Sequence, residues 1–244
     1  QALEALTPVI AVLLALMIGA VMLLALQVNP ITAYSALADG AFGSTFAIAQ
    51  TLVKATPLLL VGLGICIAFR GGVINIGGEG QIIVGALATT AFTLGFSEAP
   101  LLVLLPGGLL CGMLAGGVWG GIAGVLKARF GVNEILTTIM MNAIAVQLSN
   151  FLLRGPMIDP KEIVSGTLLA QSARLPDSAW LPRLIPQTLL HAGALFALAM
   201  AVVVYILLWR TVLGYRIRAV GLNPDAARYA GIRVPVYQAP ALRS

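Results

Sequence analysis

The stretch Arg70–Gln81 reads RGGVINIGGEGQ, and it decides how this chain folds. It places five glycines, an asparagine, a glutamate and a glutamine between two long apolar runs. Irregular backbone survives at membrane depth only where protein buries it or where it lines a water-filled cavity. An acidic side chain in a spanning region is by default a functional-site hypothesis. The stretch therefore predicts a broken membrane segment that lines a path for something polar.

The composition of the whole chain supports a membrane setting. Of 244 residues, 59% are hydrophobic and only 9% are charged, whereas a soluble domain carries about 25% charged residues. We therefore expect an all-α, polytopic membrane helix bundle with one broken or re-entrant segment. The net charge of +5 is attributed to loops beside the bilayer, so we do not expect a nucleic-acid partner.

Few residues suit enzyme chemistry or a metal site. The only histidine is His191, and the two cysteines, Cys66 and Cys111, lie inside apolar runs. We expect the histidine to be structural and the cysteines to be small buried hydrophobic residues. No glycine-rich loop ends in Gly-Lys-Ser/Thr, the signature of an ATP-binding P-loop. The sequence therefore predicts no catalytic residue, no metal ligand and no cofactor bound by this chain.

Six segments are candidates for crossing a bilayer, which takes about 20 apolar residues. They cover residues 8–28, 51–69, 71–96, 101–126, 133–153 and 189–209. The third contains the break, and its regular part, 81–96, is short for a full span. Residues 31–50 are mixed in polarity and are expected to form an interfacial helix or a loop.

The fourth segment carries a row of glycines at every fourth position. Four residues advance about 400° around a helix, so such a row wraps slowly along one side. Small residues let helix backbones approach closely, and close packing drives helix association in lipid. The row predicts packing, within the chain or between subunits, and its members are Gly108, Gly112, Gly116, Gly120 and Gly124, with Gly117 and Gly121 in a second row.

Lysines and arginines predict the orientation, because they are enriched in cytoplasmic loops. An even number of crossings separates Arg70, the 127–129 turn and everything after Trp209, so these fall on one side. That side holds nine basic residues, whereas the loop 154–188 holds four beside several acids and prolines. We therefore predict a cytoplasmic N-terminus and an external proline-rich loop.

The polar residues of the break are the first candidates to face a solute: Asn75, Glu79 and Gln81. Termini of broken helices present backbone N–H and C=O groups to a ligand. Alternatively, Asn75 and Glu79 cap the broken helices and contact no solute.

Other polar residues lie on the fifth segment. Asn142, Gln147 and Asn150 are on it, and interhelical hydrogen bonding is favoured for the last two over a polar seam. Asn133 and Glu134 resemble a helix cap, with contact to a coupling partner as the alternative.

A short capped helix is predicted near the end of the chain. Asn223 suits an N-cap, Pro224 the first helical position and Asp225 the positive end of the helix dipole. Gly231 suits the left-handed position just past the end. So short a helix is marginal alone in water, so it would be stable by packing and would offer a docking surface. The alternative is a solvated basic loop.

Three motifs resemble one family of membrane proteins. They are FRGGVINIGGEGQIIVGAL (69–87), GVNEILTTIMMNAIA (131–145) followed by LLRGPMIDP (152–160), and GYRIRAVGLNPDAARYAGI (214–232). Their order and spacing are typical of permease subunits of bacterial ABC importers for branched-chain amino acids, ribose and nucleosides. The resemblance covers residues 51–234 and is closest to the nucleoside and simple-sugar branch.

The resemblance implies specific partners and roles. A cytoplasmic coupling helix would dock on a separate ATPase chain, which carries ATP and Mg²⁺. Further partners would be a second permease subunit, identical or not, and an extracytoplasmic substrate-binding protein, in the inner membrane of a bacterial cell. The most favoured solute is a nucleoside, followed by a simple sugar. The residues that match the coupling helix are Asn223, Pro224, Asp225, Ala226, Ala227, Arg228 and Gly231.

The end of the chain departs from the family pattern. Members of the family continue into further membrane helices, whereas residues 235–244 cannot span a bilayer. We therefore expect one permease domain over residues 1–234, with its C-terminal helices missing. Two other classes stay open: an ion-coupled secondary transporter, which also uses broken helices, and a membrane scaffold. The capped helix favours the ABC permease, because a secondary carrier needs no such docking element.

Overall fold

The computed structural model describes residues 2–167, 169–232 and 234. Helices dominate this part of the chain, which confirms the predicted all-α class. Residues 235–244, for which we predicted a tail that does not span, lie outside the described residues. The helices are α1 (Ala2–Ala25), α2 (Pro30–Phe42), α3 (Thr45–Arg70), α4 (Gly78–Gly95), α5 (Leu101–Phe130), α6 (Glu134–Arg154), α7 (Pro160–Ser165), the 3₁₀ turn η1 (Asp177–Ala179), α8 (Gly193–Arg210), α9 (Val212–Leu222) and α10 (Pro224–Tyr229).

Among the described residues, five helices are long and apolar enough to cross a membrane: α1, α3, α5, α6 and α8. Helix α4, the regular part of the broken third segment, is not one of them, so five of the six predicted crossings are supported and the third stays a prediction. Helix α8 also has 18 residues, so length alone does not explain the difference. Residues 73–76 are not helical, and the first turn of α4 contains the polar residues Glu79 and Gln81, which make it less apolar than α8. Helix α3 begins at Thr45, six residues before the predicted start.

The chain divides into two compact units by its internal contacts. The first unit comprises Gln1–Ala55 and Arg183–His191, and the second comprises Thr56–Pro182 and Ala192–Ser244. In the first unit, the Tyr34 hydroxyl of α2 donates a hydrogen bond to the Leu16 carbonyl of α1 at 2.6 Å. Residues 30–42 are thus helical, and this resolves the open choice between a helix and a loop for much of the mixed segment.

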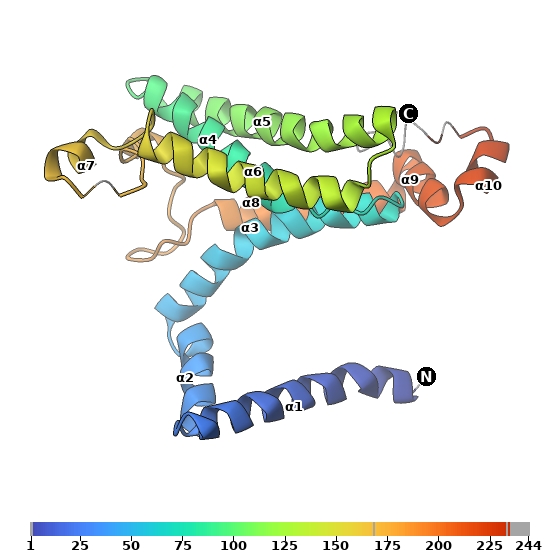
Figure 1. Ribbon diagram of the computed structural model, residues 1–244, viewed down its shortest axis with the longest axis horizontal. Helices are drawn as coiled ribbons and strands as arrows, with labels where there is room; N and C mark the ends of the chain where they lie inside the picture. The colour runs from blue at the N-terminus through green and yellow to red at the C-terminus, as the bar shows by residue number, and fades with distance from the viewer. Residues whose placement is uncertain (1, 168, 233, 235–244) are drawn as a thin grey trace. The chain divides into compact units, whose positions relative to one another are not determined.

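The second unit is built around α4, which contacts both α5 and α6 (Figure 1). The glycine row of α5 faces α4 at backbone distance. A Cβ added to Gly116 would lie 3.0 Å from the Gln81 carbonyl oxygen, and one added to Gly112 would lie 3.2 Å from that of Gly85. A Cβ on Gly117 would meet no atom within 4 Å. The first glycine row therefore packs within the chain, as one of the two predicted alternatives.

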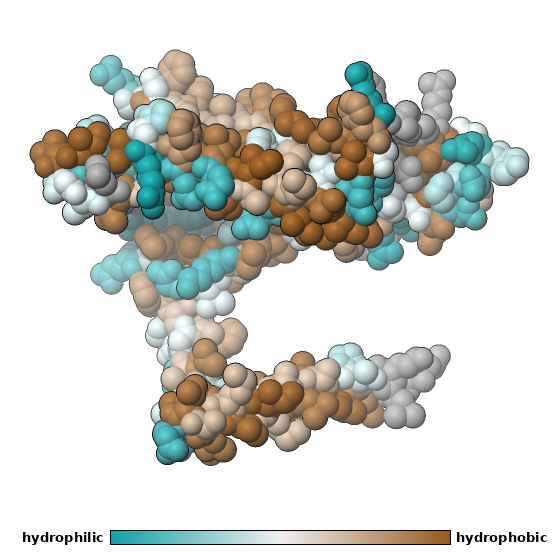
Figure 2. Space-filling model, in the orientation of Figure 1, coloured by the Kyte–Doolittle hydropathy of each residue, from teal (hydrophilic) through white to brown (hydrophobic). Residues whose placement is uncertain are grey.

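The two ends of the second unit differ in the elements that they carry (Figure 1). The end of α3, the end of α5, the start of α6 and helices α9 and α10 lie together, whereas α7 lies at the opposite end. Arg70 and Lys127 thus share an end with α9, and Lys161 is at the other, as the crossing argument predicted. Figure 2 shows hydrophilic residues gathering over α9 and α10, beside the brown apolar flanks of the helices. Which end faces the cytoplasm stays a prediction.

The two cysteines are free thiols. Cys111 is half-buried and its Sγ lies 3.7 Å from the Ala88 carbonyl oxygen, so it contacts α4. Cys66 is exposed, which corrects the expectation that both are buried.

Candidate functional site

The break between α3 and α4 is held in place from α6. After α3 ends, Gly72 takes a left-handed φ of 76°, which a side chain would strain. Asn142 then clamps the chain from both sides. Its Oδ1 accepts from the Gly80 N–H at 2.9 Å, and its Nδ2 donates to the Ile76 carbonyl at 3.0 Å. One amide therefore satisfies a donor and an acceptor that the break has left without helical partners.

Gly80 is glycine because of its neighbours. A Cβ there would lie 2.9 Å from both the Asn142 Oδ1 and the Trp119 Nε1, closer than real side chains come. Helices α5 and α6 therefore both press on the first turn of α4. This close approach fixes where α4 begins and where the residues before it lie.

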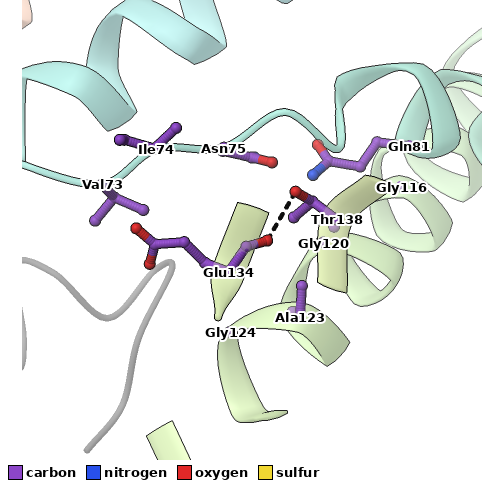
Figure 3. Close-up of a pocket in the computed structure, with 12 residues that line it drawn as sticks. Val73, Ile74, Asn75, Gln81, Gly116, Gly120, Ala123, Gly124, Glu134 and Thr138 are labelled. Atoms are coloured by element: carbon purple, nitrogen blue, oxygen red, sulfur yellow. Dashed lines mark hydrogen bonds between the residues drawn. The ribbon is translucent and has the colours of Figure 1, made fainter. Parts of the chain in front are cut away.

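A cavity of about 180 Å³ lies beside the break. Figure 3 shows the side-chain ends of Asn75 and Gln81 turned toward one another, with the Thr138 hydroxyl close by. An adjoining open groove of about 600 Å³ shares Asn75 and Gln81 and extends to α3. The residues that line the cavity are Val73, Ile74, Asn75, Gln81, Gly116, Gly117, Gly120, Gly121, Ala123, Gly124, Glu134 and Thr138.

The polar groups of the cavity are partly engaged in local structure. The Asn75 Oδ1 accepts from the Gly77 N–H at 2.8 Å, so Asn75 also stabilises the turn before α4. Thr138 donates to the Glu134 carbonyl at 2.8 Å, which leaves its oxygen able to accept. An amide has two donors and an acceptor. Asn75 thus has the local capping role that the sequence left as one alternative, and contact of Asn75 or Gln81 with a solute stays a prediction.

One end of the cavity, at Gln81, lies deep in the apolar region, and the other reaches Glu134 beside the end of α5. Gln81 packs against Gly116 and Gly120 of α5. The apolar stretch of α5 runs over Leu101–Lys127, so Gly116 is two residues from its middle. At 1.5 Å per residue this offset is about 3 Å. Amide groups at such depth are costly unless they have partners or water, which favours a path for polar solutes.

Glu79 lies elsewhere. It is in the first turn of α4 and exposed, and it does not line this cavity. The carboxylate that the cavity does contain is that of Glu134, which forms an ion pair with Lys127 across the turn between α5 and α6. The sequence predicted for Glu134 only a place in a helix cap or a contact with a coupling partner, because the pairing of α6 with the break cannot be seen in sequence spacing.

The remaining amides of α6 have separate places. Asn133 caps the helix, with its Oδ1 accepting from the Ile135 N–H at 2.9 Å. Gln147 and Asn150 are exposed and line a shallow groove together with Arg154 at the far end of α6. This arrangement gives them no hydrogen bond to another helix within the described residues, so the favoured interhelical role stays a prediction.

The predicted short helix is present as α10. The Asn223 side chain accepts from the N–H groups of Asp225 and Ala226 at 3.1 and 3.0 Å. At the other end, the Gly231 N–H donates to the Arg228 carbonyl, and the Ile232 N–H donates to that of Ala227. With Gly231 at a φ of 79°, these two bonds make a Schellman ending. Both caps are thus as the sequence predicted.

The two faces of α10 differ in how exposed their side chains are. Ala227 is 4% exposed and packs with Val220 and Val234, so it does not belong to an outer docking surface. Tyr229, two residues later and therefore about 200° around the helix, is 95% exposed, and Leu222 is 87% exposed. The sequence did not predict these two residues as part of a docking surface. Which side of α10 is exposed becomes clear only once Ala227 is seen to be buried.

Comparisons with known proteins place the chain among transport proteins. It is 40% identical over 237 residues to a glucose ABC transporter permease protein of Haloferax volcanii, with 93% of this chain and 60% of that protein covered. A guanosine ABC transporter permease protein of Bacillus subtilis is 37% identical over 94% of this chain and 65% of its own length. A nucleoside ABC transporter permease protein of Lactococcus lactis is 35% identical, with 94% and 64% covered.

The chain thus spans about 60–65% of the length of these relatives. No solved structure matches it. Residues 47–242 match a family described as branched-chain amino acid transport system / permease component. That match covers the break, the glycine row, the cavity and α10. The chain therefore belongs to this family of permease components.

Proposed function

We propose that this chain is part of the transmembrane permease subunit of an ATP-driven ABC importer that moves a nucleoside inward. The observation that carries the proposal is the cavity at the break, where Asn75 and Gln81 present amides near the middle of an apolar bundle. Hydrogen-bonding groups of this kind suit the edge of a nucleobase and the hydroxyls of a ribose. The cavity of about 180 Å³ and its adjoining groove of about 600 Å³ together fall within the size range of small-molecule sites, about 300–1,000 Å³.

The second support is α10, which we propose docks on the ATPase. Its exposed residues are Asn223, Pro224, Asp225, Ala226, Arg228 and Gly231, beside the large exposed side chains of Tyr229 and Leu222. Exposed aromatic residues anchor many protein interfaces. In this proposal ATP and Mg²⁺ are held by the partner ATPase. Ala227 contributes by supporting α10 from inside.

The remaining partners follow from the same proposal. A second permease subunit would complete the path, and an extracytoplasmic binding protein would deliver the solute. The protein would lie in the cell membrane with its N-terminus in the cytoplasm. Cysteine labelling with an impermeant reagent tests the orientation: position 161 should react in sealed cells and position 216 should not. Reaction at 216 would reverse the proposed topology.

The choice of solute has two candidates. Two relatives are named for guanosine or nucleosides, and one of comparable identity is named for glucose. The amide pair favours the nucleoside, because a base edge offers donors and acceptors in one plane. A sugar is the second candidate, because hydroxyl groups bind the same amides.

One experiment tests the transport proposal as a whole. The full-length protein, its ATPase, its second permease chain and its binding protein are purified together and reconstituted in vesicles. Uptake of labelled guanosine, uridine, glucose, ribose and leucine is measured with ATP and with a non-hydrolysable analogue. We expect ATP-dependent guanosine or uridine uptake. Uptake driven by an ion gradient without ATP would instead indicate a secondary transporter, and leucine uptake without nucleoside uptake would overturn the solute assignment.

A second experiment tests the docking role of α10. Tyr229→Ala should remove an anchor and lower the amount of ATPase that co-purifies, whereas Tyr229→Phe keeps the ring and serves as the control. Hot-spot truncations cost about 2 kcal/mol or more, which is roughly a thirtyfold loss of affinity. Unchanged co-purification of Tyr229→Ala would contradict the proposed docking surface.

A further inference from the structure

The end of α9 lies directly on the backbone of the break. A Cβ added to Gly221 would overlap the Arg70 carbonyl oxygen and lie 2.9 Å from the Gly72 nitrogen. A Cβ added to Gly72 would lie 3.2 Å from the Gly221 Cα. No side chain separates the two segments, so the contact has no flexible layer that could absorb a displacement.

A second contact holds the same segments together. Trp209, near the end of α8, has the Arg218 guanidinium over its ring at 4.4 Å and that of Arg70 at 4.9 Å. Cations at these distances are attracted to the face of an indole ring. The ring therefore links the end of α3 to α9, the same two elements that meet at Gly72 and Gly221.

Helix α10 is fixed to α9 by a small apolar cluster. Val220 is fully buried, and Ala227 and Val234 pack against it with Ile232 alongside. Val220 immediately precedes Gly221. A force applied to α10 from outside therefore reaches the Gly221 contact through packed side chains, because close-packed interiors transmit strain.

On the other side of the contact, the break leads to the cavity within a few residues. Val73 is 5% exposed, and Asn75 lines the cavity three residues after Gly72. Asn142 holds the next carbonyl, that of Ile76. Displacement of Gly72 therefore moves an anchored, non-helical segment rather than a whole helix.

We infer that Gly72 and Gly221 form a backbone joint through which α9 and α10 set the position of the break, and thereby of Asn75. This inference rests on the proposed importer function, in which α10 meets the ATPase. Gly221 and Trp209 are positioning residues in this scheme, since neither lines the cavity.

The test follows the break directly, in the complete reconstituted complex. Ile76, 44% exposed, is replaced by cysteine after Cys66→Ser and Cys111→Ser, and its labelling rate is measured with and without ATP. The test variant is Gly221→Ala. The control is Gly62→Ala on α3, where a Cβ meets nothing within 4 Å. Uptake and ATP hydrolysis are recorded in parallel.

We expect ATP to change the labelling rate at position 76 in the parent complex and in Gly62→Ala, but not in Gly221→Ala. Solute uptake by Gly221→Ala should fall about tenfold, within the usual range of coupling energies, while its ATP hydrolysis continues. If labelling in Gly221→Ala responds to ATP as in the parent, or if the parent transports without any response at 76, the joint is refuted. Should Gly221→Ala not assemble, Trp209→Leu leaves the backbone contact free of overlap and should weaken the same response, and a full response there would overturn the inference.

The same measurements separate this inference from the proposed function. If the parent complex binds no ATPase and shows no ATP-dependent uptake, the importer proposal fails, and the joint fails with it. If the parent complex shows ATP-dependent uptake, but ATP changes the labelling rate at position 76 in Gly221→Ala as it does in the parent, the joint alone fails.

Discussion

Helix α4 meets its two neighbours in opposite ways. Toward α5 it packs mainly backbone against glycine. Two side chains add hydrogen bonds across this interface: the Thr89 hydroxyl donates to the Gly108 carbonyl at 2.9 Å, and the Cys111 thiol donates to the Ala88 carbonyl at 3.7 Å. Toward α6 it depends on the two hydrogen bonds of Asn142. The first interface depends mainly on close backbone packing, whereas the second depends on a polar side chain that holds an interrupted backbone.

The difference separates two tasks. Close glycine packing places α4 in the bundle, because in lipid helix association depends on van der Waals contact. The Asn142 clamp instead fixes the residues before α4, including Asn75 in the cavity. Substitutions that disrupt the first interface should therefore lower the yield of folded protein. Substitutions that disrupt the second should leave an assembled protein that transports poorly.

The largest effect is expected for Gly112→Val. Its side chain would meet Thr89 and the Gly85 carbonyl oxygen, so α4 and α5 would have to move apart. Overpacking of this kind costs about 1–3 kcal/mol or more. We expect little folded protein after solubilisation, measured by size-exclusion chromatography and thermal unfolding. A normal yield with an unchanged melting temperature would show that the glycine row does not set this interface.

A smaller effect is expected for Asn142→Leu, which keeps the size of the side chain. The Gly80 N–H and the Ile76 carbonyl would lose their partner, and an unsatisfied buried group costs about 1–3 kcal/mol. Because α4 still packs on α5, the complex should assemble and hydrolyse ATP, while uptake falls about tenfold or more. Gln147→Leu, at an exposed position of the same helix, is the control. Equal losses of uptake in Asn142→Leu and Gln147→Leu would show that the hydrogen bonds of Asn142 have no special role.

Next in size is the pair Gln81→Leu and Glu79→Gln. Gln81→Leu removes an amide from the cavity and should raise the solute concentration for half-maximal uptake, because the lost hydrogen bond is worth about 0.5–1.5 kcal/mol.

Glu79→Gln should also reduce uptake, by less than about fivefold, since a carboxylate in a first helical turn contributes about 0.3–1 kcal/mol. Uptake assays of purified variants check both. A larger loss of uptake in Glu79→Gln would indicate that the solute binds on the exposed side of α4.

The smallest effect is expected for Gly121→Ala. A methyl group there meets nothing within 4 Å, although Gly121, like Gly112, belongs to a row of glycines at every fourth position of α5. Yield and melting temperature should stay within experimental error of the parent. A drop comparable with that of Gly112→Val would mean that the second glycine row also packs, against another subunit.

The sequence by itself determined the features that depend on neighbours along the chain. The apolar runs predicted the spanning helices, because lipid requires about 20 apolar residues whatever the tertiary arrangement. Asn223, Pro224 and Gly231 predicted both ends of α10, since capping is satisfied within a few residues. The glycines of RGGVINIGGEGQ predicted the break for the same reason.

Only the tertiary structure decided which residues meet across the fold. Asn142 and Ile76 are 66 residues apart, and no spacing rule along one helix connects them. The direction of Glu79, away from the cavity, depends on the rotation of α4 that Gly112 and Gly116 impose on it. Ala227 is inward and Tyr229 outward because α9 covers one side of α10. In each case the deciding force is a close contact with a distant segment, which local propensity does not contain.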